Sequence, residues 1–290
     1  MEFAVQPSAV AARASATVRR MKSEDYVLGT DAQELARLSF QHEAWVAHAY
    51  ALWQRAGLRT GMTVLDLGAG PGFTSLDLAQ VVGPRGKVIA RERSARFLEF
   101  LAAESRRRSL AWIEPSLGDV ETLELPPNSV DALYARWLFC WVADAGVALE
   151  RAVRPLKKGG VVVLQEYLDW SAMKLLPREP AFERGVAACM ESWKRANATI
   201  DIVERIPELA ERCGLVVEHL APIARSGAVG SLEWRWMDEF FTQYLPKLVE
   251  AGLMTPSELS AALAVWREPH AGPPRRCVTP TMADVVLRKR

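Results

Sequence analysis

Short apolar runs alternate with longer amphipathic stretches through the middle of the chain. The apolar runs have the length of buried strands, and the stretches between them carry apolar residues at helical spacing. The runs are residues 63–67, 86–91, 111–117, 130–135 and 160–166, with helices expected from Phe73, from Ser94 and over 143–153. Such alternation is typical of a parallel sheet that is covered by helices on both faces.

The segments on either side of this alternating part show other patterns. Residues 31–56 carry apolar side chains at near-helical spacing and predict one long helix. After residue 166 the pattern predicts helices over 167–197, 201–213, 231–251 and 256–266, and strands over 216–223 and 282–289. With these two late strands the sequence predicts an α/β fold with a seven-stranded, mostly parallel sheet.

Composition places the chain among globular proteins with a packed core. It has 290 residues, 50% of them hydrophobic, which suits one large α/β domain or one domain with an elaborated insertion. Its 36 lysines and arginines nearly balance 35 aspartates and glutamates, so no overall positive field favours nucleic acid as a partner. Charges interrupt every apolar run well before the ~20 residues that cross a bilayer. We therefore expect a cytoplasmic protein without a membrane partner.

The cysteines and the first residues add little chemistry. Four cysteines lie far apart and include no CxxC pair, so we interpret them as reduced, mostly packed thiols and predict no metal site. Residues 1–20 are rich in small and basic side chains. They are open to two interpretations, a targeting segment or a frayed terminus.

The first strand leads directly into a glycine-rich turn. Residues 64–72 read Val-Leu-Asp-Leu-Gly-Ala-Gly-Pro-Gly, and a helix is expected from Phe73. Glycines let the backbone turn sharply and let a ligand lie against main-chain N–H groups. The dinucleotide fingerprint GxGxxG would require glycine in place of Phe73, so the spacing departs from the nicotinamide pattern. A phosphate-binding turn and a purely structural turn are the alternatives.

This run resembles motif I of the class I methyltransferases that depend on S-adenosylmethionine (SAM), and later motifs of that family follow in order. The likeness covers about residues 31–166 well and the remainder loosely. It implies a Rossmann-like fold and SAM as the cofactor. It also implies that Asp66, with the backbone of Gly68, Ala69 and Gly70, orients the methionine part of SAM.

The second strand ends in an acid that the resemblance assigns to the ribose of SAM. Glu92 stands there between Arg91 and Arg93, and a carboxylate has two acceptor oxygens for two hydroxyl donors. Arg93 is a further candidate contact of the cofactor. The flanking arginines leave a surface ion pair open as the alternative role of Glu92.

The third strand is followed by Gly118, Asp119 and Val120. The resemblance assigns the adenine amino group to Asp119, with the backbone of Gly118 and Val120 beside it. A Gly-Asp pair alone is a common turn. Acids after three consecutive strands carry more weight, because ligands in open α/β sheets bind beyond the carboxyl ends of the strands.

The fourth strand runs into a cluster of aromatic residues. Arg136 fits a family pattern in which this position touches SAM and the acceptor, whereas Trp141 stands where that pattern commonly has histidine. Aromatic faces attract a sulfonium cation and stack on flat acceptors. The candidate walls of an acceptor pocket are Trp45, Trp137, Trp141 and Trp170. Burial in the core is the alternative for each of them.

The first long helix resembles the N-terminal cover of small-molecule methyltransferases, which closes over SAM. Tyr26 and Gln41 become candidate SAM contacts by this resemblance. The candidate bases are His42, Glu166 and Tyr167, and a base is needed only if the acceptor carries a proton of high pKa. An ordinary half-exposed helix position is the alternative for His42.

The leading hypothesis is an enzyme that moves a methyl group from SAM to an oxygen, nitrogen or carbon nucleophile of a small aromatic or lipophilic acceptor. A SAM-binding protein without transfer activity, a sensor or partner subunit, is the second hypothesis, and a nicotinamide-dependent oxidoreductase is the third. The aromatic stripe in 234–244 is open to three interpretations: core, lid or homodimer contact.

The same reasoning divides the chain into four parts. We expect a mobile N-terminal extension, a helical cover, a SAM-binding core, and a C-terminal part that combines a helical lid with the last strands of the sheet. Their limits are 1–25, 26–60, 61–170 and 171–290.

Overall fold

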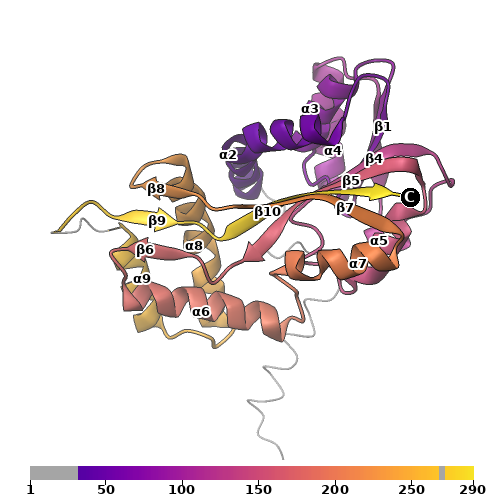
Figure 1. The fold of residues 1–290 in the computed structure, drawn as a ribbon. Coiled ribbons are helices and arrows are strands. Elements are labelled where there is room, and N and C mark those ends of the chain that lie inside the picture. Colours follow the sequence, from indigo (N-terminus) through magenta and orange to yellow (C-terminus); the bar gives the residue numbers. More distant parts are fainter. Residues whose placement is uncertain (1–31, 268–271) are drawn as a thin grey trace, which may run out of the picture.

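The computed structural model describes residues 32–267 and 272–290, and a seven-stranded sheet forms its centre (Figure 1). The strand order is β3-β2-β1-β4-β5-β10-β7. The pairs from β3 to β5 are parallel, and β10 is antiparallel to both of its neighbours. This confirms the predicted architecture. The strands are β1 (Thr63–Leu67), β2 (Lys87–Glu92), β3 (Ile113–Leu117), β4 (Val130–Arg136), β5 (Leu156–Asp169), β7 (Leu215–Ile223) and β10 (Thr281–Lys289).

Helices cover both faces of this sheet (Figure 1). Neighbouring strand residues point to opposite faces: Val64 belongs to the apolar cluster under α2, α3 and α4, and Leu65 to the cluster that includes α5 and α7. Because both faces are buried, the strands are nearly continuous apolar runs. One face carries α2 (Ala32–Ala56), α3 (Phe73–Val82) and α4 (Ala95–Arg107), and the other carries α5 (Ala145–Val153) and α7 (Ile206–Arg212).

A second lobe lies at the end of the sheet where β5 ends and β10 begins (Figure 1). Three helices and a small antiparallel sheet of order β6-β9-β8 form it. Its helix α8 packs against α2, so the lobe and α2 meet near the carboxyl ends of the parallel strands. Its elements are β6 (Lys174–Leu176), α6 (Pro180–Arg195), β8 (Ser226–Ala228), α8 (Leu232–Glu250), α9 (Pro256–Arg267) and β9 (Arg276–Val278).

The segment 167–197 differs from the helix predicted there. β5 continues to Asp169 beside β10, and β6 follows before α6 begins at Pro180. Proline suits the first turn of a helix, where its missing N–H is not needed. The sequence also does not predict the small sheet, because three-residue strands are too short to show an alternating pattern.

Two further expectations concern the membrane and the N-terminus. None of the helices within the described ranges is long and apolar enough to cross a bilayer. The extension expected over 1–25 and the candidate contact Tyr26 lie outside the described residues.

Candidate functional site

The carboxyl ends of four adjacent parallel strands bring the predicted polar residues together. Asp66 lies on β1, Glu92 ends β2, Asp119 follows β3 and Arg136 ends β4. These strands are neighbours in the order β3-β2-β1-β4. The arrangement places three acids and one arginine along the edge where ligands of open α/β sheets bind.

The glycine-rich turn after β1 is tied to the end of β2. The N–H groups of Gly68 and Ala69 donate to the carbonyl of Arg91 at 2.9 and 3.1 Å. Gly68 has a φ of 65°, and a Cβ there would lie 2.9 Å from Cδ1 of Leu138. Glycine is therefore needed at this position for both its conformation and its close neighbour.

Asp66 is the buried acid of the group. Its carboxyl accepts a hydrogen bond from the hydroxyl of Ser75 at 2.5 Å, and only 2% of the residue is exposed. Burial raises the pKa of Asp66 to about 7, although the Ser75 hydrogen bond and the charge of Arg136 act in the opposite direction. Asp66 therefore changes charge near neutral pH.

Glu92 is held by backbone N–H groups. Its Oε2 accepts from Gly70 and its Oε1 from Ser94, both at 2.9 Å. Each carboxylate oxygen has a second lone pair, so both can still accept from a ligand. Arg91 donates to the carbonyl of Leu117 at 2.8 Å, and Arg93 is exposed. Among the described residues Glu92 forms no salt bridge with either arginine.

The turn after β3 packs against Arg91. Gly118 has a φ of 141°, and a side chain there would collide with the Arg91 guanidinium. Asp119 caps the short 3-10 helix η1 (Val120–Thr122) by accepting from the N–H of Glu121 at 3.0 Å. Val120 is buried. The turn thus presents the backbone of residues 118–120 beside the end of β2.

Arg136 is the central cation of the site. Its Nη2 donates to the hydroxyl of Thr74 at 3.2 Å and lies 3.1 Å from Nδ1 of His42, and its guanidinium lies 5.0 Å from the centre of the Trp137 ring. Its Nη1 is buried without a hydrogen-bond partner among the described residues. A buried donor of this kind could donate to an anionic ligand.

His42 is fixed by both of its ring nitrogens. Because a guanidinium can only donate, Nδ1 accepts from Arg136. Nε2 then carries the proton and donates to Asp77 at 2.8 Å. The ring also stacks on Phe73, with 5.9 Å between the ring centres. These contacts fix the orientation of the His42 ring beside Arg136.

Gln41 precedes His42 on α2 and is buried. Its side-chain carbonyl accepts from Nη1 of Arg37 at 2.7 Å, and Arg37 also forms two 2.7 Å hydrogen bonds to Glu34. These bonds place Gln41 in a polar cluster within the predicted helical cover.

Three of the four predicted tryptophans join one aromatic wall. Trp137 lies edge-on to Trp45 at 5.8 Å and stacks on Tyr167 at 6.1 Å. Trp170 contacts Tyr167 at 5.7 Å. Trp141 is 41% exposed and connects to this group through Trp193, whose ring lies 6.1 Å from that of Trp141 and 4.7 Å from that of Trp170.

Glu166 lies behind this wall and is fully buried. Its Oε1 accepts from the N–H groups of Leu138 and Phe139, each at 2.8 Å. Burial raises the pKa of Glu166 to about 7, although these two N–H groups favour the charged form. Tyr167 is also buried, and its ring belongs to the wall.

Sequence reasoning missed several residues of this arrangement. Thr74, Ser75 and Asp77 follow the glycine turn and contact Arg136, Asp66 and His42. Their position in the first turns of α3 is a signal that could have found them. Trp236 of α8 contacts both Trp45 and Trp137, and it belongs to the stripe in 234–244. Helical spacing alone does not distinguish such a wall from core.

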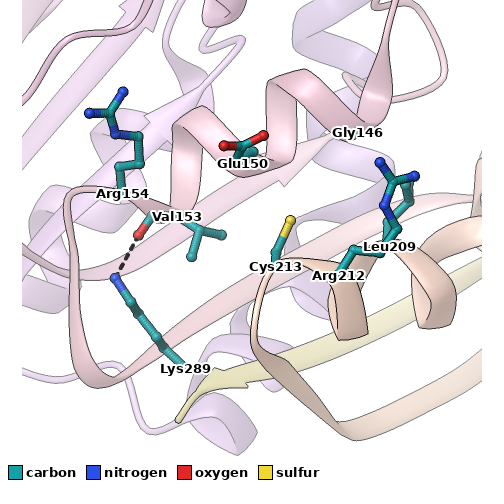
Figure 2. Close-up of a pocket in the computed structure, with 8 residues that line it drawn as sticks. All are labelled: Gly146, Glu150, Val153, Arg154, Leu209, Arg212, Cys213 and Lys289. Atoms are coloured by element: carbon teal, nitrogen blue, oxygen red, sulfur yellow. Dashed lines mark hydrogen bonds between the residues drawn. The ribbon is translucent and has the colours of Figure 1, made fainter.

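A separate cavity of about 340 Å³ lies between α5 and α7 (Figure 2). One of its residues, Lys289, donates to the carbonyl of Val153 at 2.9 Å. Lys289 ends the antiparallel β10, so the cavity lies at the amino ends of the parallel strands and outside the candidate site. It is lined by Gly146, Glu150, Val153, Arg154, Leu209, Arg212, Cys213 and Lys289.

Comparisons with known proteins agree with this geometry. Residues 65–164 match the family model described as methyltransferase domain. The chain is 38% identical to an uncharacterized 37.1 kDa protein in transposon TN4556 from Streptomyces fradiae, over 40% of this chain and 33% of that protein. It is 34% identical to a demethylmenaquinone methyltransferase from Lactococcus lactis, over 45% of this chain and 51% of that enzyme.

The fold has known counterparts over most of the chain. The YcgJ protein from Bacillus subtilis superposes with a TM-score of 0.57 at 15% identity, covering 86% of this chain and 99% of that one. The chain spans about half or less of the length of the two curated relatives. Residues 65–164 therefore form a methyltransferase domain on a Rossmann-like sheet.

Proposed function

We propose that this protein transfers the methyl group of SAM to a flat, lipophilic small molecule. The observation that carries the cofactor part of the proposal is the buried Nη1 of Arg136, which has no hydrogen-bond partner in the described part of the chain and whose charge acts on Asp66. An unpaired buried donor costs free energy, and the carboxylate of SAM would satisfy it. Asp66 in its charged form would attract the amino group of the same ligand.

The remaining strand-end residues fit the rest of the cofactor. Glu92 would accept from the ribose hydroxyls with the lone pairs that its backbone bonds leave. Asp119 and the backbone of Val120 would contact adenine, and the turn at Gly68 would let the ligand lie against the main chain. Gln41 lies on α2 and would contact the cofactor from the helical cover.

SAM supplies an activated methyl group, so the protein mainly has to orient the acceptor and exclude water. Trp137 is only partly buried and would face the acceptor, while the buried rings of Trp45 and Trp236 pack against it and hold it in place. His42 uses both ring nitrogens and Glu166 is buried, which favours an acceptor atom that needs no strong base. An activated ring carbon, as in a reduced quinone precursor, meets this condition, and the name of the Lactococcus relative supports that class.

A transfer assay tests the proposal. The protein is incubated with SAM and a short-chain prenylated naphthoquinol, and S-adenosylhomocysteine and methylated product are both measured by mass spectrometry. Equal amounts of the two are expected. Trp236→Ala should raise the KM for the naphthoquinol, whereas Trp236→Phe should keep it close to the wild-type value, because the ring remains.

The second hypothesis, a SAM-binding protein without transfer, is favoured by the engaged nitrogens of His42 and by Trp141 in place of a histidine. Tight binding of SAM without methylated product from any flat lipophilic acceptor would support it and contradict our proposal. The third hypothesis, a nicotinamide-dependent oxidoreductase, is not favoured, because Phe73 at the start of α3 stands where the dinucleotide fingerprint requires glycine.

A further inference from the structure

The turn after β4 adopts an unusual backbone conformation. Trp137 has a φ of 51°, in the left-handed region that bulky side chains rarely adopt. Its N–H donates to the carbonyl of Gln165 at 3.0 Å, which fixes the start of the turn to β5. Such a conformation persists only where the surrounding structure holds it.

Glu166 holds the next two residues. Its Oε1 accepts from the N–H groups of both Leu138 and Phe139. Glu166 follows Gln165 on β5, so two adjacent residues of one strand bind three consecutive N–H groups of the turn. The Cys140 thiol also hydrogen-bonds the Glu166 carboxyl, and Oε2 is buried.

The turn connects the two halves of the candidate site. Leu138 lies against the glycine turn at Gly68, the expected cofactor side. The Trp137 ring lies beside the Arg136 guanidinium and stacks on Trp236, the expected acceptor side. A displacement of this turn would therefore disturb both sides at once.

We infer that Glu166 is a positioning residue that holds the turn of residues 137–139 in place. Only the identity of the ligands on the two sides rests on the proposed function. A base would have to reach the acceptor, but the Glu166 carboxyl lies inside the protein, against the N–H groups of Leu138 and Phe139 and against Cys140.

Two variants distinguish a positioning role of Glu166 from a role in proton transfer. Glu166→Gln keeps a carbonyl oxygen that can accept from both amides, and Glu166→Ala removes the acceptor. In Glu166→Ala we expect the amides of Leu138 and Phe139 to exchange hydrogen at least about tenfold faster, and S-adenosylhomocysteine to bind at least about fivefold more weakly. Glu166→Gln should restore both readouts to within about twofold of wild type. Glu114→Ala, which removes an exposed carboxylate of β3, should change neither.

The outcomes decide the inference. Unchanged amide exchange in Glu166→Ala would overturn it, and so would a Glu166→Gln variant as defective as Glu166→Ala. Glu166→Asp provides a second test if the alanine variant does not fold, because its shorter side chain cannot reach both amides and should also speed their exchange. If the wild type does not bind S-adenosylhomocysteine, the proposed function fails, while the exchange measurement still tests the role of Glu166.

Discussion

At the scale of single residues, the site depends on one buried acid, Asp66, beside one cation, Arg136. Asp66 and Arg136 lie at the ends of neighbouring strands, and the charge of Arg136 partly offsets the cost of burying Asp66. The amino-acid part of SAM carries an ammonium group, opposite in charge to ionised Asp66, and a carboxylate, opposite in charge to Arg136. These two residues should therefore recognise that part of the cofactor and not its nucleoside.

Arg136→Lys tests this division of the cofactor. Lysine keeps the charge but loses the planar fork that contacts Thr74 and His42. We expect S-adenosylhomocysteine to bind about tenfold more weakly, as for a lost charge-assisted hydrogen bond. Methylthioadenosine, which lacks the carboxylate and the amine, should bind unchanged. Equal weakening of both ligands in calorimetry would contradict the assignment.

The pKa of Asp66 predicts that the affinity for the cofactor depends on pH. Its pKa of about 7 means that it is mostly charged at pH 8 and mostly protonated at pH 6. Because the ligand amine binds the charged form, affinity for S-adenosylhomocysteine should fall by about tenfold for each pH unit below the pKa. Asp66→Asn should give a nearly flat profile between pH 6 and 8. A wild-type profile that is equally flat would show that Asp66 does not bind the amine.

At the scale of elements, α2 is attached to the second lobe by arginines. Arg225 lies 4.9 Å from the centre of the Trp45 ring and donates to the carbonyl of Ala44 and to Glu233, each at 2.7 Å. Arg235 lies 4.1 Å from the centre of the Phe40 ring. These contacts hold α2 next to α8.

Arg225→Ala should reduce the free energy of unfolding by about 1–3 kcal/mol, because a cation–π contact and two hydrogen bonds are lost together. Urea unfolding measures this change. Arg212→Ala is the matched control: its side chain is 65% exposed, so a change of less than about 0.5 kcal/mol is expected. An equally small change for Arg225→Ala would mean that the contact does not stabilise the docking of α2.

Some helices and strands could be predicted from the sequence, and others could not. The strand at 63–67 and the helix after it were predictable, because a buried strand and a helix have different periods and the glycine turn separates them. The small sheet was not, since β6 pairs with β9 across about a hundred residues of sequence and each strand has three residues.

Some residues of the candidate site could likewise be predicted from the sequence, and others could not. The strand-end acids could be predicted, because the carboxyl ends of parallel strands meet at one edge. The hydrogen bonds from His42 to Asp77 and from Glu166 to the turn depend on side-chain contacts between separate elements, and no local pattern carries them.

At the scale of the whole molecule, the sheet, α2 and the second lobe meet at one place. The strand ends supply the charged groups, α2 supplies His42 and Trp45, and α8 supplies Trp236. If SAM binds there, it contacts elements from distant parts of the chain and should stabilise their association.

The most direct test of this account is a calorimetric titration of the protein with S-adenosylhomocysteine, beside Glu92→Ala and Glu114→Ala. We expect micromolar affinity in the wild type, a loss of about 1.5–3 kcal/mol in Glu92→Ala and little change in Glu114→Ala, because Glu92 would provide the charge-assisted contact to the ribose and the Glu114 side chain is 53% exposed. No binding of folded wild-type protein at millimolar ligand would contradict the account.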